Sequence, residues 1–179
     1  MENKQITHSL KGLGMLSLLF QMIFLAAAIY FRSAYLIGCG GLLLWLGGSR
    51  LLAQKHTGPW CSVLLILPAI ALCSLSAAPL LAELIPPYDI FQTGVVCALV
   101  GVQACLTTVS LIVRRKEKDV SAWTMRQFDA ALLCVLLPAL VSQLLLLGEE
   151  GEWAQMVCLT GCVMGGVLLL LGCNLLLCA

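Results

Sequence analysis

Residues 91–118 read FQTGVVCALVGVQACLTTVSLIVRRKEK, and this stretch decides the fold class. Its first 23 residues, 91–113, carry no charge. About 20 apolar residues in an α-helix cross the roughly 30 Å core of a bilayer. The five residues that follow, 114–118, form the densest basic cluster of the chain, and such clusters mark the cytoplasmic ends of spans. The stretch therefore predicts a membrane-spanning helix that ends in the cytoplasm.

The composition of the whole chain agrees with a membrane class. Of its 179 residues, 61% are hydrophobic and 11% are charged, whereas about a quarter of the residues of a soluble domain are charged. We predict an all-α integral membrane protein, a single polytopic domain over residues 1–179, with six transmembrane helices arranged as three helical hairpins. The predicted spans are about 12–31, 35–52, 60–82, 91–113, 130–147 and 154–177.

The charges of the loops predict the topology. With the N-terminus in the cytoplasm, nine of the ten Lys and Arg residues lie in cytoplasmic segments, and Arg32 is the exception. Because orientation follows the Lys/Arg bias, both termini are expected in the cytoplasm. We interpret residues 114–128 as a basic cytoplasmic loop whose end, with Trp123 and Phe128, is an interfacial lead-in to the fifth span. A basic helix that binds lipid or a calmodulin-like partner is the alternative for this segment.

Polar residues inside the spans are the candidates for a binding site. Polar side chains avoid lipid and turn toward the interior of a bundle, where they either bond across a dry interface or line a cavity. Gln103, Thr107 and Ser110 follow i, i+4, i+7 spacing on one face of the fourth span, and Gln21 has a comparable depth in the first. The candidate cavity-lining residues are Gln21, Gln103, Thr107, Ser110 and Gln143.

Small residues predict the helix-packing faces, because close contact between helices holds membrane bundles together. The candidate packing residues are Gly94, Ala98, Gly101 and Cys105 in the fourth span and Cys158, Cys162, Gly165 and Gly172 in the sixth. The third span has small residues on more than one face, so we expect it to be central. Leu67-Pro68-Ala69-Ile70 and Leu137-Pro138-Ala139-Leu140 suggest a repeat of hairpins in parallel orientation.

Motifs for chemistry are missing from the sequence. Charges occur in the predicted spans only at their ends, and both histidines, His8 and His56, fall in predicted cytoplasmic segments. The ten cysteines form no CxxC pair and have no zinc spacing with histidine, so we interpret them as small packing residues. No P-loop, GxGxxG motif or complete acid, base and nucleophile set is present. We therefore expect no enzyme activity, no metal and no cofactor.

Three functions remain open. The kinked third and fifth spans and the polar residues favour a small transport-associated or solute-binding membrane subunit. The alternative is an accessory or structural membrane protein that acts through helix–helix contacts without a substrate. A membrane enzyme that acts on lipid or thiol, which would need a reactive cysteine, ranks third.

The length and the six spans resemble those of the substrate-binding membrane subunits of energy-coupling-factor transporters. Ala26-Ala27-Ala28 of the first span departs from the AxxxA pattern of that family. The resemblance implies another membrane subunit or a cytoplasmic ATPase as a partner besides the lipid bilayer, with no nucleic acid. The expected location is a bacterial cytoplasmic membrane.

Overall fold

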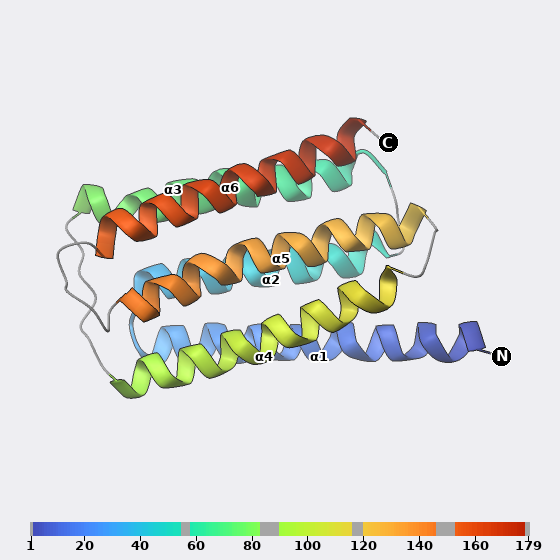
Figure 1. Cartoon of the computed structure of the whole chain (residues 1–179), viewed down its shortest axis with the longest axis horizontal. Coiled ribbons are helices and arrows are strands. Elements are labelled where there is room, and N and C mark those ends of the chain that lie inside the picture. Colours follow the sequence, from blue (N-terminus) through green and yellow to red (C-terminus); the bar gives the residue numbers. More distant parts are fainter. Residues whose placement is uncertain (1, 55–57, 83–89, 116–119, 146–152, 178–179) are drawn as a thin grey trace.

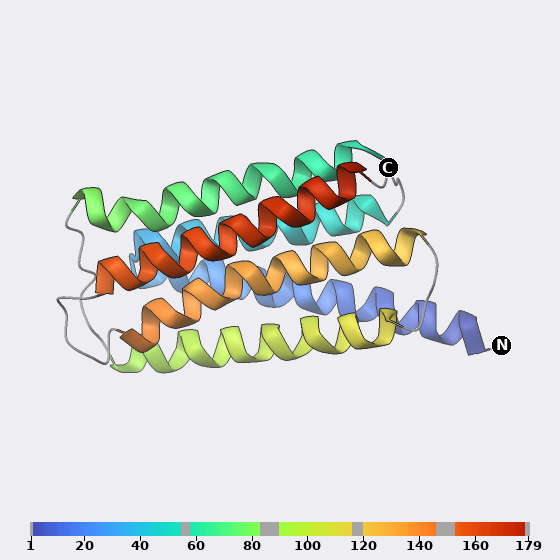
Figure 2. The ribbon, with the colours of Figure 1, turned by 45° about the horizontal axis from the view of Figure 1, so that its top comes forward.

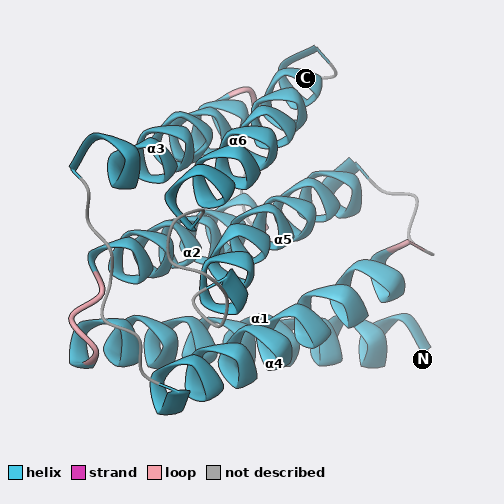
Figure 3. Cartoon of the chain, turned by 60° about the vertical axis from the view of Figure 1, so that its left-hand side comes forward, coloured by secondary structure: helices cyan, strands magenta, loops and turns pink. Residues whose placement is uncertain are grey.

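The computed structural model describes residues 2–54, 58–82, 90–115, 120–145 and 153–177. Nearly all of this part of the chain is helical, with short loops (Figure 3). Six of its helices are long and apolar enough to cross a membrane, as predicted. The helices are α1 (Glu2–Tyr30), α2 (Ala34–Ala53), α3 (Trp60–Ala82), α4 (Ile90–Arg114), α5 (Val120–Leu145) and α6 (Trp153–Leu177).

The helices pack in two layers of three. One layer has the order α1, α2, α3 and the other the order α4, α5, α6, and each helix packs against its counterpart in the other layer (Figure 1). The pairs across the layers are α1 with α4, α2 with α5, and α3 with α6, the last being the most extensive contact. α1 begins and α6 ends at the same end of the bundle (Figure 1), which we call the terminal end.

This arrangement differs from three hairpins. α1 packs on α2 and α5 packs on α6, but α3 and α4 do not form a packed pair and lie on opposite edges of the bundle (Figure 2). The chain instead folds as two halves, α1–α3 and α4–α6, whose corresponding helices run in opposite directions (Figure 1). The parallel hairpin repeat predicted from the proline segments is therefore not how the chain is organised, because α3 pairs with α6.

The central helices are α2 and α5, whereas α3 was expected in this position. Of the span residues, 61% are buried in α5 and 50% in α2, against 33% in α3. Only α2 and α5 have a neighbour on both sides within their layer and one across it. The small residues on several faces of α3 are therefore not a sign of a central position, since outward faces carry them as well.

The turn between α1 and α2 is determined locally. Arg32 has the left-handed φ of 54°, which ends α1, and Ser33 then caps α2 by accepting a hydrogen bond from the Leu36 N–H at 3.5 Å. The short turn at Arg32 and Ser33 holds α1 and α2 side by side.

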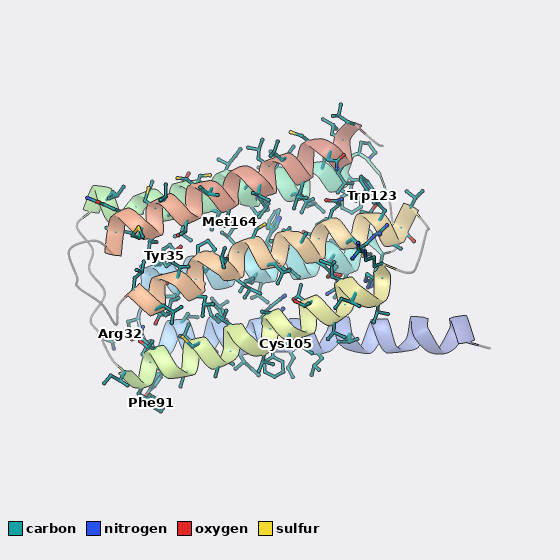
Figure 4. The ribbon with its side chains drawn as sticks, in the orientation of Figure 1. Arg32, Tyr35, Phe91, Cys105, Trp123 and Met164 are labelled. Carbon is teal, nitrogen blue, oxygen red and sulfur yellow. The ribbon has the colours of Figure 1, made fainter. Side chains whose placement is uncertain are left out.

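Arg32 and Phe91 lie at the end of the bundle opposite the terminal end, and Trp123 lies at the terminal end (Figure 4).

Candidate functional site

Buried polar side chains gather between α1, α2, α4 and α5. Four of the predicted cavity-lining residues are among them, since Gln21, Gln103, Thr107 and Ser110 are all at most 3% exposed. Four further members were not assigned to a site from the sequence: Ser17, Arg50, Arg114 and Asp129. The group divides into a central amide network and a charged cluster nearer the terminal end.

The central amide network links α1 to α4 through one serine. The Gln103 Nε2 donates to Ser17 Oγ at 2.7 Å, and the Gln21 Nε2 lies 3.4 Å from the same oxygen. The two glutamines therefore meet through Ser17 and not directly. Their carbonyl oxygens, Gln21 Oε1 and Gln103 Oε1, are buried and accept no hydrogen bond from the described residues. The network thus offers two acceptors that lack donors.

A glycine makes room for this network. A Cβ at Gly47 of α2 would overlap the Gln21 side-chain amide. Only a residue without a side chain lets α2 approach α1 here while Gln21 stays in the interior. The Thr107 hydroxyl, by contrast, donates to the backbone carbonyl oxygen of Gln103, one turn earlier in the same helix, at 2.8 Å. This hydroxyl is therefore engaged locally.

The charged cluster is centred on Ser110. Its hydroxyl accepts from Arg50 Nη2 at 2.7 Å and donates to Asp129 Oδ2 at 2.9 Å. The Arg114 Nε lies 3.4 Å from Ser110 Oγ and 3.6 Å from Asp129 Oδ2. The Arg50 Nε lies 3.0 Å from Asp129 Oδ1, an ion pair whose angles fall short of a hydrogen bond. Helices α2, α4 and α5 are thus tied together by one carboxylate, one hydroxyl and two guanidinium groups.

This cluster corrects the expectation that charges occur only at the ends of spans. Asp129 is fully buried. It lies nine residues after the start of α5 at Val120, since residues 120–128, interpreted from the sequence as the end of a loop, are helical. The predicted span began only at residue 130. A signal was present in the sequence, since buried positions at three- and four-residue spacing run through this segment: Ala122, Met125, Asp129, Leu132 and Leu136. The basic residues nearby masked this periodicity.

Gln143 is also buried but does not join the site. It lies 14 residues after Asp129 on α5, or about 21 Å along the helix axis. Its side-chain oxygen has no hydrogen-bond partner among the described residues. The five predicted cavity-lining residues therefore divide into four that share one interface and one that lies apart.

A partly open, apolar cavity lies elsewhere among the described residues. It has a volume of about 260 Å³ and lies between α4, α5 and α6, lined by side chains that include Val100, Leu136 and Met164. Met164 lies on α6, above α5 in the view of Figure 4. None of the five predicted residues lines this cavity.

The predicted packing faces behave differently on α4 and α6. Gly165 and Gly172 of α6 are buried against α3, where a Cβ at Gly165 would overlap Cys73 Sγ and one at Gly172 would come within 2.8 Å of Ile66 Cγ1. Cys158 is half-buried and Cys162 is exposed. On α4, all four predicted residues (Gly94, Ala98, Gly101 and Cys105) are exposed, so none of the described helices covers them. The opposite, polar face of α4 is the one that packs inward.

None of the nine cysteines in the described part of the chain forms a disulfide bond. The sulfur atoms of Cys158 and Cys162, one turn apart on α6, lie 4.0 Å from each other. Within the described ranges, no three His, Cys, Asp or Glu side chains are grouped so that they could hold a metal ion. The expectation of no metal and no cofactor stays a prediction.

The fold and the site define an all-helical protein whose six long apolar helices indicate an integral membrane protein in contact with the lipid bilayer. Comparison with protein-family models, with curated proteins and with solved structures finds no match to this chain.

Proposed function

We propose that the chain is a small transport-associated membrane subunit that binds a small neutral or mostly apolar solute. The observation that carries this proposal is the central amide network. Gln21 Oε1 and Gln103 Oε1 are buried acceptors without donors in the described structure, and a buried acceptor without a donor costs about 1–3 kcal/mol. A solute with one or two N–H or O–H groups would supply the missing donors.

The organisation of the bundle supports a role in transport. Many transporters consist of two repeats of opposite orientation, with the substrate between them near the middle of the bilayer. Here the halves α1–α3 and α4–α6 face each other with opposite directions (Figure 1). Ser17 and Gln21 of α1 meet Gln103 of α4 at the interface between these halves.

The proposed orientation places the terminal end in the cytoplasm. Support comes from the basic residues of this end, where Arg50 and Arg114 lie in the last turns of α2 and α4. A bacterial cytoplasmic membrane is the proposed location, with another membrane subunit or a cytoplasmic ATPase as a partner. Fusion of green fluorescent protein or alkaline phosphatase to the C-terminus tests the orientation. Green fluorescent protein is fluorescent in the cytoplasm and alkaline phosphatase is active outside it, so a fluorescent first fusion and an inactive second fusion are expected.

The solute-binding proposal is tested by purification from native membranes in mild detergent, with mass spectrometry of bound small molecules and proteins. A co-purifying metabolite that raises the melting temperature of the wild-type protein, and does so much less for Gln103→Leu, is the expected result. Gln155→Leu is the matched control, because Gln155 is exposed on α6. Purified protein that retains no solute, and whose melting temperature responds to none in a broad panel, would contradict the proposal.

A second function, an accessory subunit without a substrate, is favoured by the outer face of α4. Gly94, Ala98 and Gly101 are exposed there, and a Cβ at Gly94 or Gly101 meets nothing within 4 Å. Such a face lets another helix approach closely. This function predicts that Gly101→Leu folds normally but loses a partner in the pull-down, whereas Gln103→Leu keeps it. The reverse pattern would count against it.

A further inference from the structure

The terminal end of the bundle holds more buried positive than negative charge. In the described structure the buried charged residues are Arg50, Arg114 and Asp129, which are 2%, 4% and 0% exposed. Two guanidinium groups therefore share one carboxylate. An uncompensated charge is costly in an interior from which water is excluded, so this surplus calls for a negative partner.

The hydrogen bonds of the Arg114 guanidinium group are incomplete. Its Nε faces Ser110 and Asp129, but its Nη2 is buried and has no partner among the described residues. Asp129 is already engaged by Arg50 and Ser110, so the Nη2 of Arg114 has no carboxylate oxygen to bind. Arg126 lies one turn before Asp129 on α5, is half-buried, and likewise has a buried Nε without a partner.

The chemistry of these groups selects the ligand. A guanidinium fork matches the oxygens of a phosphate and binds them by two parallel hydrogen bonds. Apolar side chains also face outward at this end of the bundle, since Ile112 near the end of α4 is 58% exposed and Val120 at the start of α5 is 71% exposed. Basic pockets between the ends of membrane helices are suited to anionic headgroups.

We propose that Arg114, held in place by Ser110 and Asp129 and assisted by Arg126, binds a phosphate-type oxyanion at the terminal end of the bundle. The phosphate comes either from an anionic phospholipid headgroup or from a dissolved phosphate. This inference goes beyond the solute-binding proposal, because the site uses the charged cluster and not the central amides. It holds whether or not the chain transports anything.

Melting temperatures of the whole chain test the site in two arms. The first compares nanodiscs of phosphatidylcholine with nanodiscs that also contain phosphatidylglycerol. The second adds inorganic phosphate to the protein in detergent, against sodium chloride at equal ionic strength. We expect a saturable rise in melting temperature of about 5 °C. A rise in the first arm alone identifies the lipid headgroup, and a rise with inorganic phosphate identifies the dissolved anion.

Arg114→Gln should abolish this rise, whereas Arg115→Gln should keep it. Arg115 is the matched control because it is the adjacent arginine and is exposed. If Arg114→Gln does not fold, Arg114→Lys keeps the charge but loses the fork, and it should weaken binding about tenfold. No rise in either arm, an equal loss for Arg114→Gln and Arg115→Gln, or a binding curve of Arg114→Lys equal to that of the wild type would overturn the proposal.

Discussion

Arg50 and Asp129 form a buried ion pair between the two central helices, with Arg50 Nε 3.0 Å from Asp129 Oδ1 and side-chain exposures of 3% and 0%. The pair joins α2 of one half to α5 of the other. Ser110 bonds to both members and brings in α4. The charged cluster therefore connects the two halves of the bundle at the terminal end, and its members are the first targets for mutation.

Asp129→Asn should be strongly destabilising. It removes the carboxylate that compensates two buried guanidinium groups, and removal of one partner of a buried pair costs about 3–5 kcal/mol. The free energy of unfolding, measured by titration with sodium dodecyl sulfate in mixed micelles, checks this value. Arg115→Gln, at an exposed position, should stay within about 0.5 kcal/mol of the wild type. Equal stability of the two variants would mean that the buried cluster does not form.

Ser110→Ala should cost less than Asp129→Asn. The substitution removes the hydroxyl that accepts from Arg50 and donates to Asp129, but the opposite charges remain beside each other. The expected loss is about 1–3 kcal/mol, measured in the same titration. Thr108→Ala, on the exposed face of α4, is the control and should be nearly neutral. A Ser110→Ala protein less stable than Asp129→Asn would contradict this order.

Gly47→Ala should disturb the central amide network. The added methyl group would occupy the place of the Gln21 amide, so Gln21 must leave its hydrogen bond with Ser17. Gly48→Ala is the control, since a Cβ at Gly48 meets nothing within 4 Å.

A double-mutant cycle identifies the cause. In a Gln21→Ala background the space beside Gly47 is free, so Gly47→Ala should then be tolerated. The interaction energy between positions 21 and 47 should reach about 0.5–3 kcal/mol. If Gly47→Ala costs the same in both backgrounds, Gln21 does not occupy this space.

Gly165→Ala should weaken the contact between α3 and α6. A Cβ there would overlap Cys73 Sγ and lie 3.2 Å from the Ala69 carbonyl oxygen, so the two helices must move apart. Overpacking of this kind costs about 1–3 kcal/mol. Gly166→Ala is the neighbouring control, whose Cβ meets nothing within 4 Å. Thermal unfolding in detergent should separate the two variants, and equal melting temperatures would contradict this packing.

Much of the candidate site could be predicted because polar side chains are rare in apolar helices. The spacing of Gln103, Thr107 and Ser110 identified the face of α4 that is buried. The opposite face, with Gly94 and Gly101, was predicted to pack and is exposed instead. Small size permits close packing but does not require it, whereas a polar group in lipid must find a partner.

The charged cluster could not be predicted in the same way. Arg50, Arg114 and Asp129 all lie near the ends of apolar runs, where charges are usual and serve as topology signals. Their meeting depends on α5 starting at Val120 and on α2, α4 and α5 being neighbours. The second condition is not a property of any one segment.

The sequence by itself determined that six apolar segments form long helices, because length and hydrophobicity are local properties that the bilayer core selects directly. Only the tertiary structure decided that α3 pairs with α6, that α4 turns its small residues outward, and that Asp129 lies between two arginines. The physical reason is that lipid is as apolar as the side chains it surrounds. Hydrophobicity therefore does not distinguish one apolar face of a helix from another, and close packing and polar contacts between particular helices make that choice.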